Sequence, residues 1–484
     1  MASIRKEITK GIFWIAVAKY SGIAIQLAVT AVLARLITPA TFGTVAISMV
    51  ILNFLNIWTD IGMGPAVVQY KDLTKRHLDS LFTLNIYIGV VLATVLFMSA
   101  ELISTYYNDK ELVNVCRVMA IVLFFNSLNV IPNALMRKDK RFKDIALRTL
   151  SIQLLSGCIA IIGAANGWGV YALLVSPILT SIGVFAINFY NYPLRYVLTI
   201  NKEAFNKIAS YSLFQFVFSI FNYFSWNFDK LIVGRAFSTT QLGYYEKSYQ
   251  LMQVPISKIA FVIEPVLHPM LSTFQDNKKE LCAKNQKLVQ SMAYISFPIA
   301  LLLHFCASEI IMILYGNQWE AAVPVFRILA LSIPLLMIVS TSGAIYQAAG
   351  KTNHLFYNGI IITALTVSGY LIATFYGKTI ESVAWALTIT TPIYFCASYW
   401  IMYKFTFGEP TIMIYKALLP QIINSTIVFI IMMFACNLFI DTHLIISLIG
   451  KAILITTLTI VLAALLRQYK LNDIITIILK RIKK

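Results

Sequence analysis

Long apolar segments recur along the whole chain, and each is long enough to cross a membrane. A bilayer-spanning helix needs about 20 predominantly apolar residues. By this criterion the sequence predicts about fourteen transmembrane helices joined by short connections, that is, an all-α polytopic membrane protein. The predicted spans lie near 11–34, 42–68, 80–103, 115–136, 145–165, 169–190, 208–233, 244–271, 288–313, 321–348, 355–376, 380–403, 412–440 and 443–466.

The composition excludes a soluble domain and, with the charge distribution, a nucleic-acid partner. Of the 484 residues, 59% are hydrophobic and only 12% are charged. A net charge of +18 would suggest nucleic acid in a soluble protein. With a cytoplasmic N-terminus, however, about 27 of the 39 Lys and Arg residues fall on the cytoplasmic side. The positive-inside rule therefore explains the charge, and both termini are predicted to be cytoplasmic, the basic tail lying on anionic headgroups.

The chain also repeats itself. Arg35 precedes Gly43 by the same spacing as Arg235 precedes Gly243, a shift of 200 positions that Pro65 and Pro265 keep. Six predicted helices separate the two copies. An even number gives both copies the same membrane orientation, related by an axis along the membrane normal. The last two spans, from about 412, fall outside the repeat.

Polar side chains recur on one face of the first two spans of each half. Polar groups are costly in hydrocarbon and usually face a bundle interior or a water-filled cavity. Singly, such residues more often form interhelical hydrogen bonds; as a set, they favour a solvated cavity. The candidate lining residues are Lys19, Gln26, Asn53, Asn56, Asp60, Gln215, Asn222, Asp229, Lys230 and Lys258.

The charges among these residues have two interpretations of similar weight. Lys19 with Asp60, and Asp229 with Lys258 or Lys247, would be structural locks if they pair. Partly unpaired cations around a wet cavity would instead attract anions. Arg148, like Arg117 and Arg327, lies nearer a helix end, where a long side chain can reach the interface, and is predicted to be structural.

No pattern in the sequence predicts catalysis. The five His have no metal-ligand spacing, and neither a Walker A motif nor a G-x-S-x-G motif occurs. The six Cys are scattered along the chain, and we interpret them as small apolar residues. We therefore expect no enzyme activity, no cofactor and no metal. Glu264 and His268 lie one helical turn apart and could couple a proton to transport.

Four stretches carry a family resemblance: LARLITPATFG (33–43), WTDIGMGPAVVQ (58–69), ALMRKDKRFKDIA (134–146) and NFDKLIVGRAFSTTQLGYY (227–245). They resemble Wzx-type flippases of the WzxC-like branch, within the multidrug/oligosaccharidyl-lipid/polysaccharide exporter superfamily. The resemblance implies two pseudo-symmetric six-helix bundles around a central cavity, at 1–205 and 206–405, two additional helices at 406–466 and a basic cytoplasmic tail at 467–484. The family's acidic residue in the seventh helix maps onto Asp229, whereas Lys230 stands where Asn is frequent.

The resemblance implies a flippase of the bacterial cytoplasmic (inner) membrane. Its cargo would be an oligosaccharide repeat unit on undecaprenyl diphosphate, moved to the periplasmic leaflet by alternating access for O-antigen, capsule or exopolysaccharide assembly. Its partners would be this substrate, membrane lipids and the polysaccharide polymerase machinery. A drug or cation antiporter and a flippase for the peptidoglycan lipid precursor stay open as alternatives. From a different class, so do a membrane polymerase and a non-transporting assembly scaffold.

Overall fold

The computed structural model is helical throughout its described part, which confirms the predicted all-α polytopic fold. It describes residues 2–70, 72–197, 216, 219–220, 223–224, 226–260, 267, 270–439 and 442–466. No strand occurs among these residues. The chain forms two compact units, Met1–Gly243 (unit 1) and Tyr244–Lys484 (unit 2).

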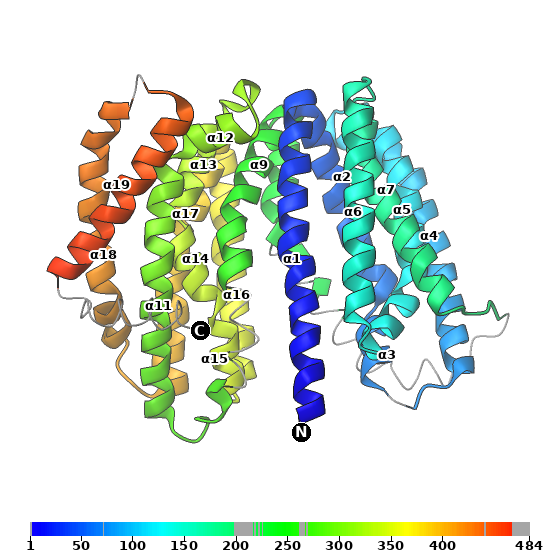
Figure 1. Ribbon diagram of the computed structural model, residues 1–484, viewed down its shortest axis with the longest axis horizontal. Coiled ribbons are helices and arrows are strands. Elements are labelled where there is room, and N and C mark those ends of the chain that lie inside the picture. Colours follow the sequence, from blue (N-terminus) through cyan, green and yellow to red (C-terminus); the bar gives the residue numbers. More distant parts are fainter. Residues whose placement is uncertain are drawn as a thin grey trace. The chain divides into compact units, whose positions relative to one another are not determined.

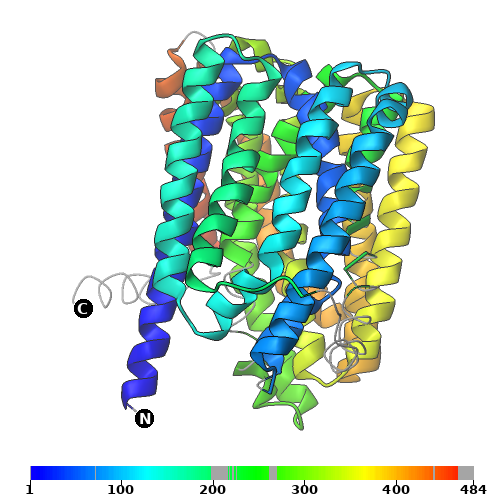
Figure 2. The same cartoon turned by 90° about the vertical axis from the view of Figure 1, so that its right-hand side faces the viewer.

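Unit 1 is a bundle of long helices in which neighbours in the chain are mostly neighbours in space. Helix α4 packs along α5, α1 packs along α6, and both α5 and α6 pack along α7 (Figure 1). Figure 2, in which unit 1 faces the viewer, shows these helices running alongside one another. The helices are α1 (Ala2–Leu36), α2 (Pro39–Asp60), α3 (Met63–Gln69), α4 (Lys75–Tyr107), α5 (Glu111–Lys138), α6 (Phe142–Ala165) and α7 (Val170–Asn191).

Unit 2 places the last two helices, α18 and α19, against its long helix α11 (Figure 1). Helix α19 also packs on α12. The α-helices are α9 (Thr239–Pro255, which begins in unit 1), α11 (Lys278–Phe305), α12 (Ala307–Leu314), α13 (Ala322–Ala330), α14 (Ile333–Ser340), α15 (Ser342–Ala348), α16 (Thr352–Ile372), α17 (Ile380–Ile401), α18 (Ile412–Ala435) and α19 (Leu444–Leu465).

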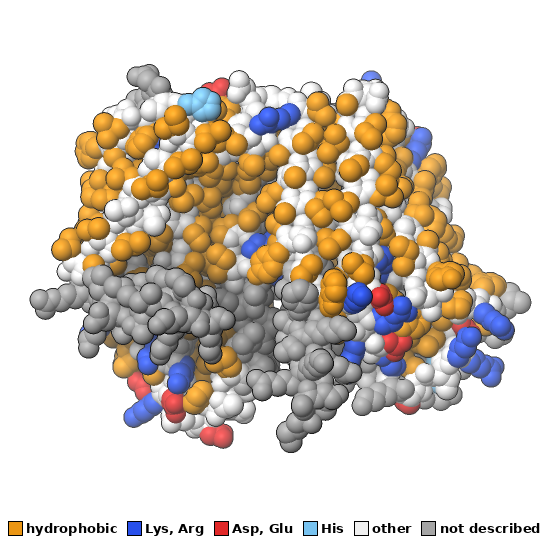
Figure 3. Space-filling model, in the orientation of Figure 1, with side chains coloured by type: hydrophobic (Ala, Val, Ile, Leu, Met, Phe, Trp, Pro, Cys, Tyr) orange, Lys and Arg blue, Asp and Glu red, His pale blue; other side chains and the backbone are white. Residues whose placement is uncertain are grey.

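Many helices expose apolar side chains as a lipid-facing surface does. In the described residues, ten helices are long and apolar enough to cross a membrane, or eleven if one bent pair is a single span. On α4, Met98 and Leu102 are each 74% exposed. Figure 3 shows a mainly hydrophobic surface over the helices of unit 1, with Lys and Arg gathered at their lower ends. The count of fourteen stays a prediction, because parts of 208–233 and 244–271 lie outside the described residues.

Three predicted spans are broken instead of continuous: 42–68, 321–348 and also 288–313, which is interrupted at Cys306 between α11 and α12. The span 42–68 is divided between α2 and α3, because Ile61 and Gly62 take left-handed backbone angles, with φ of 40° and 73°. Glycine adopts such angles at little cost, and one such residue ends a helix. The span 321–348 is three short helices, with a bend of 51° between Ala322–Ala330 and Ile333–Ala348. Pro334 stands at the start of α14, where its missing N–H costs no hydrogen bond.

The two repeat motifs begin their helices in the same way and then meet. Thr38 caps α2 by accepting from the Thr41 N–H at 3.5 Å, and Ser238, 200 positions later, accepts from the Gln241 N–H at 3.2 Å. A Cβ on Gly43 would lie 1.8 Å from the Thr239 carbonyl oxygen, and a Cβ on Gly243 would lie 2.1 Å from the Pro39 carbonyl oxygen. All these residues belong to unit 1. The repeat thus brings its own two copies into reciprocal backbone contact.

Candidate functional site

Helix α1 carries the predicted residues Lys19 and Gln26. Gln26 is exposed and Lys19 is half-buried. Within the described part of the chain, the Lys19 side chain forms no hydrogen bond or ion pair, so the structure does not join it to Asp60. Between Lys19 and Gln26, the Gly22 carbonyl oxygen accepts a hydrogen bond at 2.8 Å from Gln153 of α6, which holds this part of α1 against the bundle. The Lys19 ammonium therefore has no carboxylate partner among the described residues.

Helix α2 carries the next three predicted residues, and they differ in their surroundings. Asn53 is exposed. Asn56 accepts a hydrogen bond at 3.2 Å from Asn126 of α5. Asp60 accepts from the Gly64 N–H at 2.7 Å, across the break between α2 and α3. Asn56 and Asp60 thus have partners inside unit 1, in keeping with the interhelical reading of single polar residues.

Aromatic side chains of α2 pack against the described part of the seventh predicted span. Phe54 and Phe224 have ring centroids 5.2 Å apart, and Trp58 and Phe216 have centroids 4.9 Å apart. The Tyr223 hydroxyl donates to the Val50 carbonyl oxygen. Because aromatic pairs of this kind add to plain area burial, they fix the seventh span beside α2.

Further along the seventh span lie the two predicted residues Asp229 and Lys230. Asp229 is 2% exposed, and Lys230 is half-buried. In unit 2, Lys258 lies in a π-helical turn, Ile256–Ala260, and is half-buried. The pairs of Asp229 with Lys258 or Lys247 would join different units and stay predictions. Four predicted residues lie outside the described part of the chain: Gln215, Asn222, Glu264 and His268.

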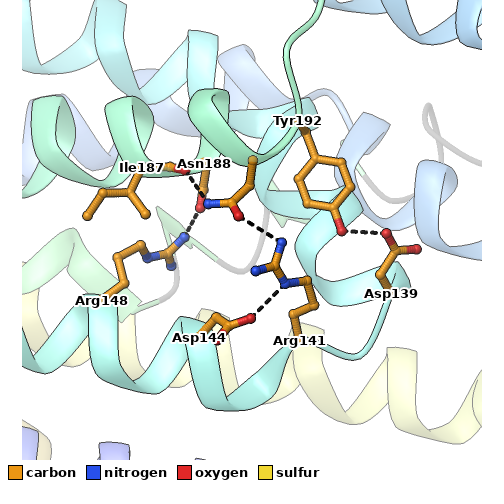
Figure 4. A network of polar contacts seen from close by, with 8 residues as sticks. Asp139, Arg141, Asp144, Arg148, Ile187, Asn188 and Tyr192 are labelled. Atoms are coloured by element: carbon orange, nitrogen blue, oxygen red, sulfur yellow. Dashed lines mark hydrogen bonds and ion pairs between the residues drawn. The ribbon is translucent and has the colours of Figure 1, made fainter.

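A polar network near the start of α6 was not predicted. Arg148 is only 8% exposed, and its reach to the membrane interface stays a prediction. Its Nη1 donates to the Asn188 side-chain oxygen of α7 (Figure 4), and the Asn188 amide donates to Asn129 of α5 at 2.7 Å. Beside them, Arg141 binds Asp144 at 2.6 Å and Asn191 at 2.8 Å. Asparagines inside apolar spans were the signal that could have revealed this network.

A loop residue completes that end of unit 1. The Tyr192 hydroxyl, just after α7, donates to the Asp139 carboxylate, just after α5 (Figure 4). Burial, helped by this hydrogen bond, raises the pKa of Tyr192. The phenol therefore stays protonated at neutral pH and keeps its role as a donor.

A buried ion pair in unit 2 was also not predicted. Lys451 of α19 pairs with Glu309 of α12, and Ser447 donates to the same carboxylate. Lys451 is 9% exposed and Glu309 is 4% exposed. Opposite charges within two predicted apolar spans were the available signal. Among the described residues, no group of three His, Cys, Asp or Glu side chains could hold a metal ion.

Comparisons with known proteins give one family and one fold. The family model "Polysaccharide biosynthesis protein" matches residues 32–324. The teichuronic acid biosynthesis protein TuaB of Bacillus subtilis (strain 168) is 26% identical over 83% of this chain and 83% of its own. The lipopolysaccharide biosynthesis protein WzxC of Escherichia coli (strain K12) is 25% identical over 76% of both chains.

Among solved structures, the lipid II flippase MurJ in an inward closed conformation is similar, with a TM-score of 0.73. The similarity covers 94% of this chain and 99% of that one, at 16% identity. At this identity the likeness concerns the fold alone. The family matches confirm the resemblance that the four sequence motifs predict.

Proposed function

Since this chain belongs to the polysaccharide biosynthesis protein family, we propose that it is a flippase for lipid-linked oligosaccharides. It moves undecaprenyl-diphosphate-linked repeat units from the cytoplasmic to the periplasmic leaflet by alternating access, for O-antigen, capsule or exopolysaccharide assembly. The family match over residues 32–324 is the observation that carries the proposal. The chain is a transporter in this proposal and not an enzyme.

The chemistry of the cargo explains why a protein is needed. Each sugar hydroxyl stripped of water without a new partner costs about 2–7 kcal/mol. An oligosaccharide has many hydroxyls, so unassisted flipping is very slow. A path lined by amide and hydroxyl side chains replaces the lost water, while the lipid tail stays in the bilayer. The exposed Gln26 and Asn53 suit this role.

Cations on the path meet the diphosphate of the cargo. Lys19 is half-buried and has no described partner, which leaves its charge for a ligand. The proposed path residues are Lys19, Gln26, Asn53, Asn56, Asp60, Gln215, Asn222, Asp229, Lys230 and Lys258, with Glu264 and His268 coupling a proton. Outward movement of about two uncompensated negative charges would also be favoured by roughly 5 kcal/mol per 100 mV of membrane potential.

We place the protein in the bacterial cytoplasmic (inner) membrane with both termini in the cytoplasm. Residues 1–205 and 206–405 form its two six-helix bundles, and 406–466 form the two additional helices. This orientation leaves most Lys and Arg residues on the cytoplasmic side. The partners are the lipid-linked substrate, membrane lipids and the polysaccharide polymerase machinery, without nucleic acid.

Complementation tests the proposal. The chain is expressed in a strain that lacks its own polysaccharide flippase, and surface polysaccharide is measured together with protein level by immunoblot. We expect export to return. No export at a normal protein level, in strains that make several different repeat units, would contradict the proposal.

A second candidate cargo is the peptidoglycan lipid precursor. The fold likeness to the lipid II flippase MurJ favours it, although a likeness of the fold alone does not carry the substrate. Rescue of a strain depleted of its lipid II flippase would favour this cargo. Rescue of the polysaccharide-deficient strain alone would favour the oligosaccharide.

A further inference from the structure

Arg148 is a buried cation that lacks a carboxylate partner. It is 8% exposed, and its Nε is buried without a hydrogen-bond partner in the described structure. Its single side-chain hydrogen bond runs from Nη1 to the neutral amide oxygen of Asn188. Arginine keeps its charge inside proteins, and a buried charge is unfavourable unless it is paired. The guanidinium of Arg148 therefore lacks a counter-ion.

The surroundings of Arg148 increase the demand for an anion. The charged side chain that acts on it most strongly is another cation, Arg137, in the last turn of α5. Arg137 is exposed, and its side chain forms no hydrogen bond or ion pair with a described residue. Arg141, by contrast, is already held by Asp144. Two guanidinium groups with donors that no described residue satisfies thus lie at the same end of unit 1, one in the last turn of α5 and one near the start of α6.

The carboxylates of this region are engaged elsewhere. Asp139 accepts from the Tyr192 hydroxyl, and Asp144 accepts from Arg141 (Figure 4). Asp60, on which Arg137 also acts, accepts from the Gly64 N–H. Between residues 137 and 148, six cationic side chains stand against these two acidic ones, Asp139 and Asp144. The acidic side chains of this stretch therefore do not neutralise its excess positive charge.

The depth of Arg148 suits the phosphate of a lipid. It lies six residues after the start of α6, which is about 9 Å along the helix axis. The headgroup region on each side of a bilayer is about 5–8 Å thick, so the guanidinium lies near the boundary between headgroups and hydrocarbon. Lys143 lies 5.6 Å from the centroid of the Trp14 ring in the same region, a pairing typical of membrane interfaces.

We propose that Arg148 and Arg137 form a subsite for the phosphate or diphosphate headgroup of a lipid at this end of unit 1. Two guanidinium groups bind phosphate oxygens through charge-assisted, bidentate hydrogen bonds. Asn188, itself oriented by Asn129, holds Arg148 in place. The assignment to cargo rests on the proposed function, in which the subsite receives the diphosphate of the substrate. An anionic phospholipid offers the same chemistry.

Native mass spectrometry of the purified full chain in a neutral detergent tests the subsite. Farnesyl diphosphate and phosphatidylglycerol are titrated separately, with phosphatidylcholine as a lipid lacking net charge. We expect Arg148→Gln and Arg137→Gln each to weaken binding of a phosphate-bearing lipid by about tenfold or more. Arg148→Lys keeps the charge but loses the fork of donors, so we expect an intermediate loss.

Arg117→Gln is the matched control, because Arg117 also lies on α5 and is half-buried but is already paired with Glu101 at 2.9 Å. It should bind as the wild type does. Selective loss of farnesyl diphosphate binding supports a cargo subsite, and equal loss of phosphatidylglycerol binding supports a resident-lipid subsite. Unchanged binding of both by Arg137→Gln and Arg148→Gln overturns the subsite. Because Arg137 is exposed, its variant keeps the test valid if Arg148→Gln does not fold.

Export in the complementation assay is read separately from binding. Restored export with no arginine-dependent lipid binding would refute the subsite while leaving the flippase proposal intact. Arginine-dependent lipid binding without restored export would support the subsite and contradict the flippase proposal.

Discussion

Gly43 and Gly243, 200 positions apart in the chain, meet backbone to backbone in unit 1. A Cβ on Gly243 would lie 3.4 Å from the Gly43 nitrogen and 2.1 Å from the Pro39 carbonyl oxygen. Each glycine belongs to one copy of the repeated motif, and each contacts the first turn of the other copy's helix. Only residues without a side chain permit this approach.

The first prediction concerns this contact. Alanine at a helical glycine normally stabilises by about 0.5–1 kcal/mol. Gly43→Ala should instead lower the thermal unfolding midpoint, because its Cβ would lie 1.8 Å from the Thr239 carbonyl oxygen and force the two helices apart. Gly243→Ala should act in the same way. Thermal unfolding of the purified protein, followed by circular dichroism, measures both.

Gly359→Ala is the control for this prediction, because a Cβ there would meet no atom within 4 Å. It should be neutral or slightly stabilising. In the double variant, the second substitution should cost much less than the first, because the helices are already separated. Two independent, additive losses would mean that the glycines do not share one contact.

Much of the helical plan could be predicted from the sequence, because hydrophobic length is a strong signal in a membrane protein. The predicted span 115–136 corresponds to α5, and 145–165 to α6, within a few residues at each end. The break after Asp60 was not predicted, because the length of an apolar run is the same whether or not it bends. Ile61 in a left-handed conformation leaves no clear mark in composition.

The candidate site was harder to predict from the sequence than the helices were. Helical spacing identifies which polar residues share a face but not what that face meets. Asn56 and Asn53 belong to one stripe, yet Asn56 bonds to Asn126 and Asn53 is exposed. The surroundings of Arg148 could not be predicted either, because its position near a helix end gives no sign of the buried network that tertiary packing creates.

The second prediction concerns the buried pair of Glu309 and Lys451. Glu309→Gln should destabilise unit 2 by about 3–5 kcal/mol, because it leaves the Lys451 ammonium buried without a counter-charge. The double variant Glu309→Gln with Lys451→Met should recover most of the loss, since no charge is then left unpaired. The shift of the thermal unfolding midpoint measures each variant.

Lys284→Met is the control for that pair, because Lys284 and Glu280 form an exposed ion pair at 4.0 Å. Such pairs contribute about 0–1 kcal/mol, so the midpoint should barely move. A double variant that is as unstable as the sum of its two single variants would refute the pairing account.

The third prediction concerns the segment after α7, which two side chains of α4 hold in place. Asp79 accepts from the Arg195 N–H at 2.8 Å, and Thr83 accepts from the Val197 N–H at 3.0 Å. Asp79→Leu removes the acceptor and should cost about 1–3 kcal/mol. Hydrogen exchange at the Arg195 amide should become faster. Glu101→Gln, at the exposed end of the same helix, should leave that exchange unchanged.

The fourth prediction concerns Lys19 as a cation on the transport path. In the described structure it is half-buried and forms no hydrogen bond or ion pair, so its removal should cost little stability. Lys19→Ala should therefore reduce polysaccharide export in the complementation assay at a normal protein level. Lys19→Arg should keep part of the export, because it keeps the charge.

Lys278→Ala separates the loss of a functional cation from the loss of any positive charge, because Lys278 is exposed at the start of α11. It should export as the wild type does. If Lys19→Ala also exports normally, Lys19 does not belong to the path. If Lys19→Ala fails only because its protein level falls, the side chain has a structural role that its lack of contacts conceals. Export per unit of protein decides between the two, since a diphosphate contact affects transport and not abundance.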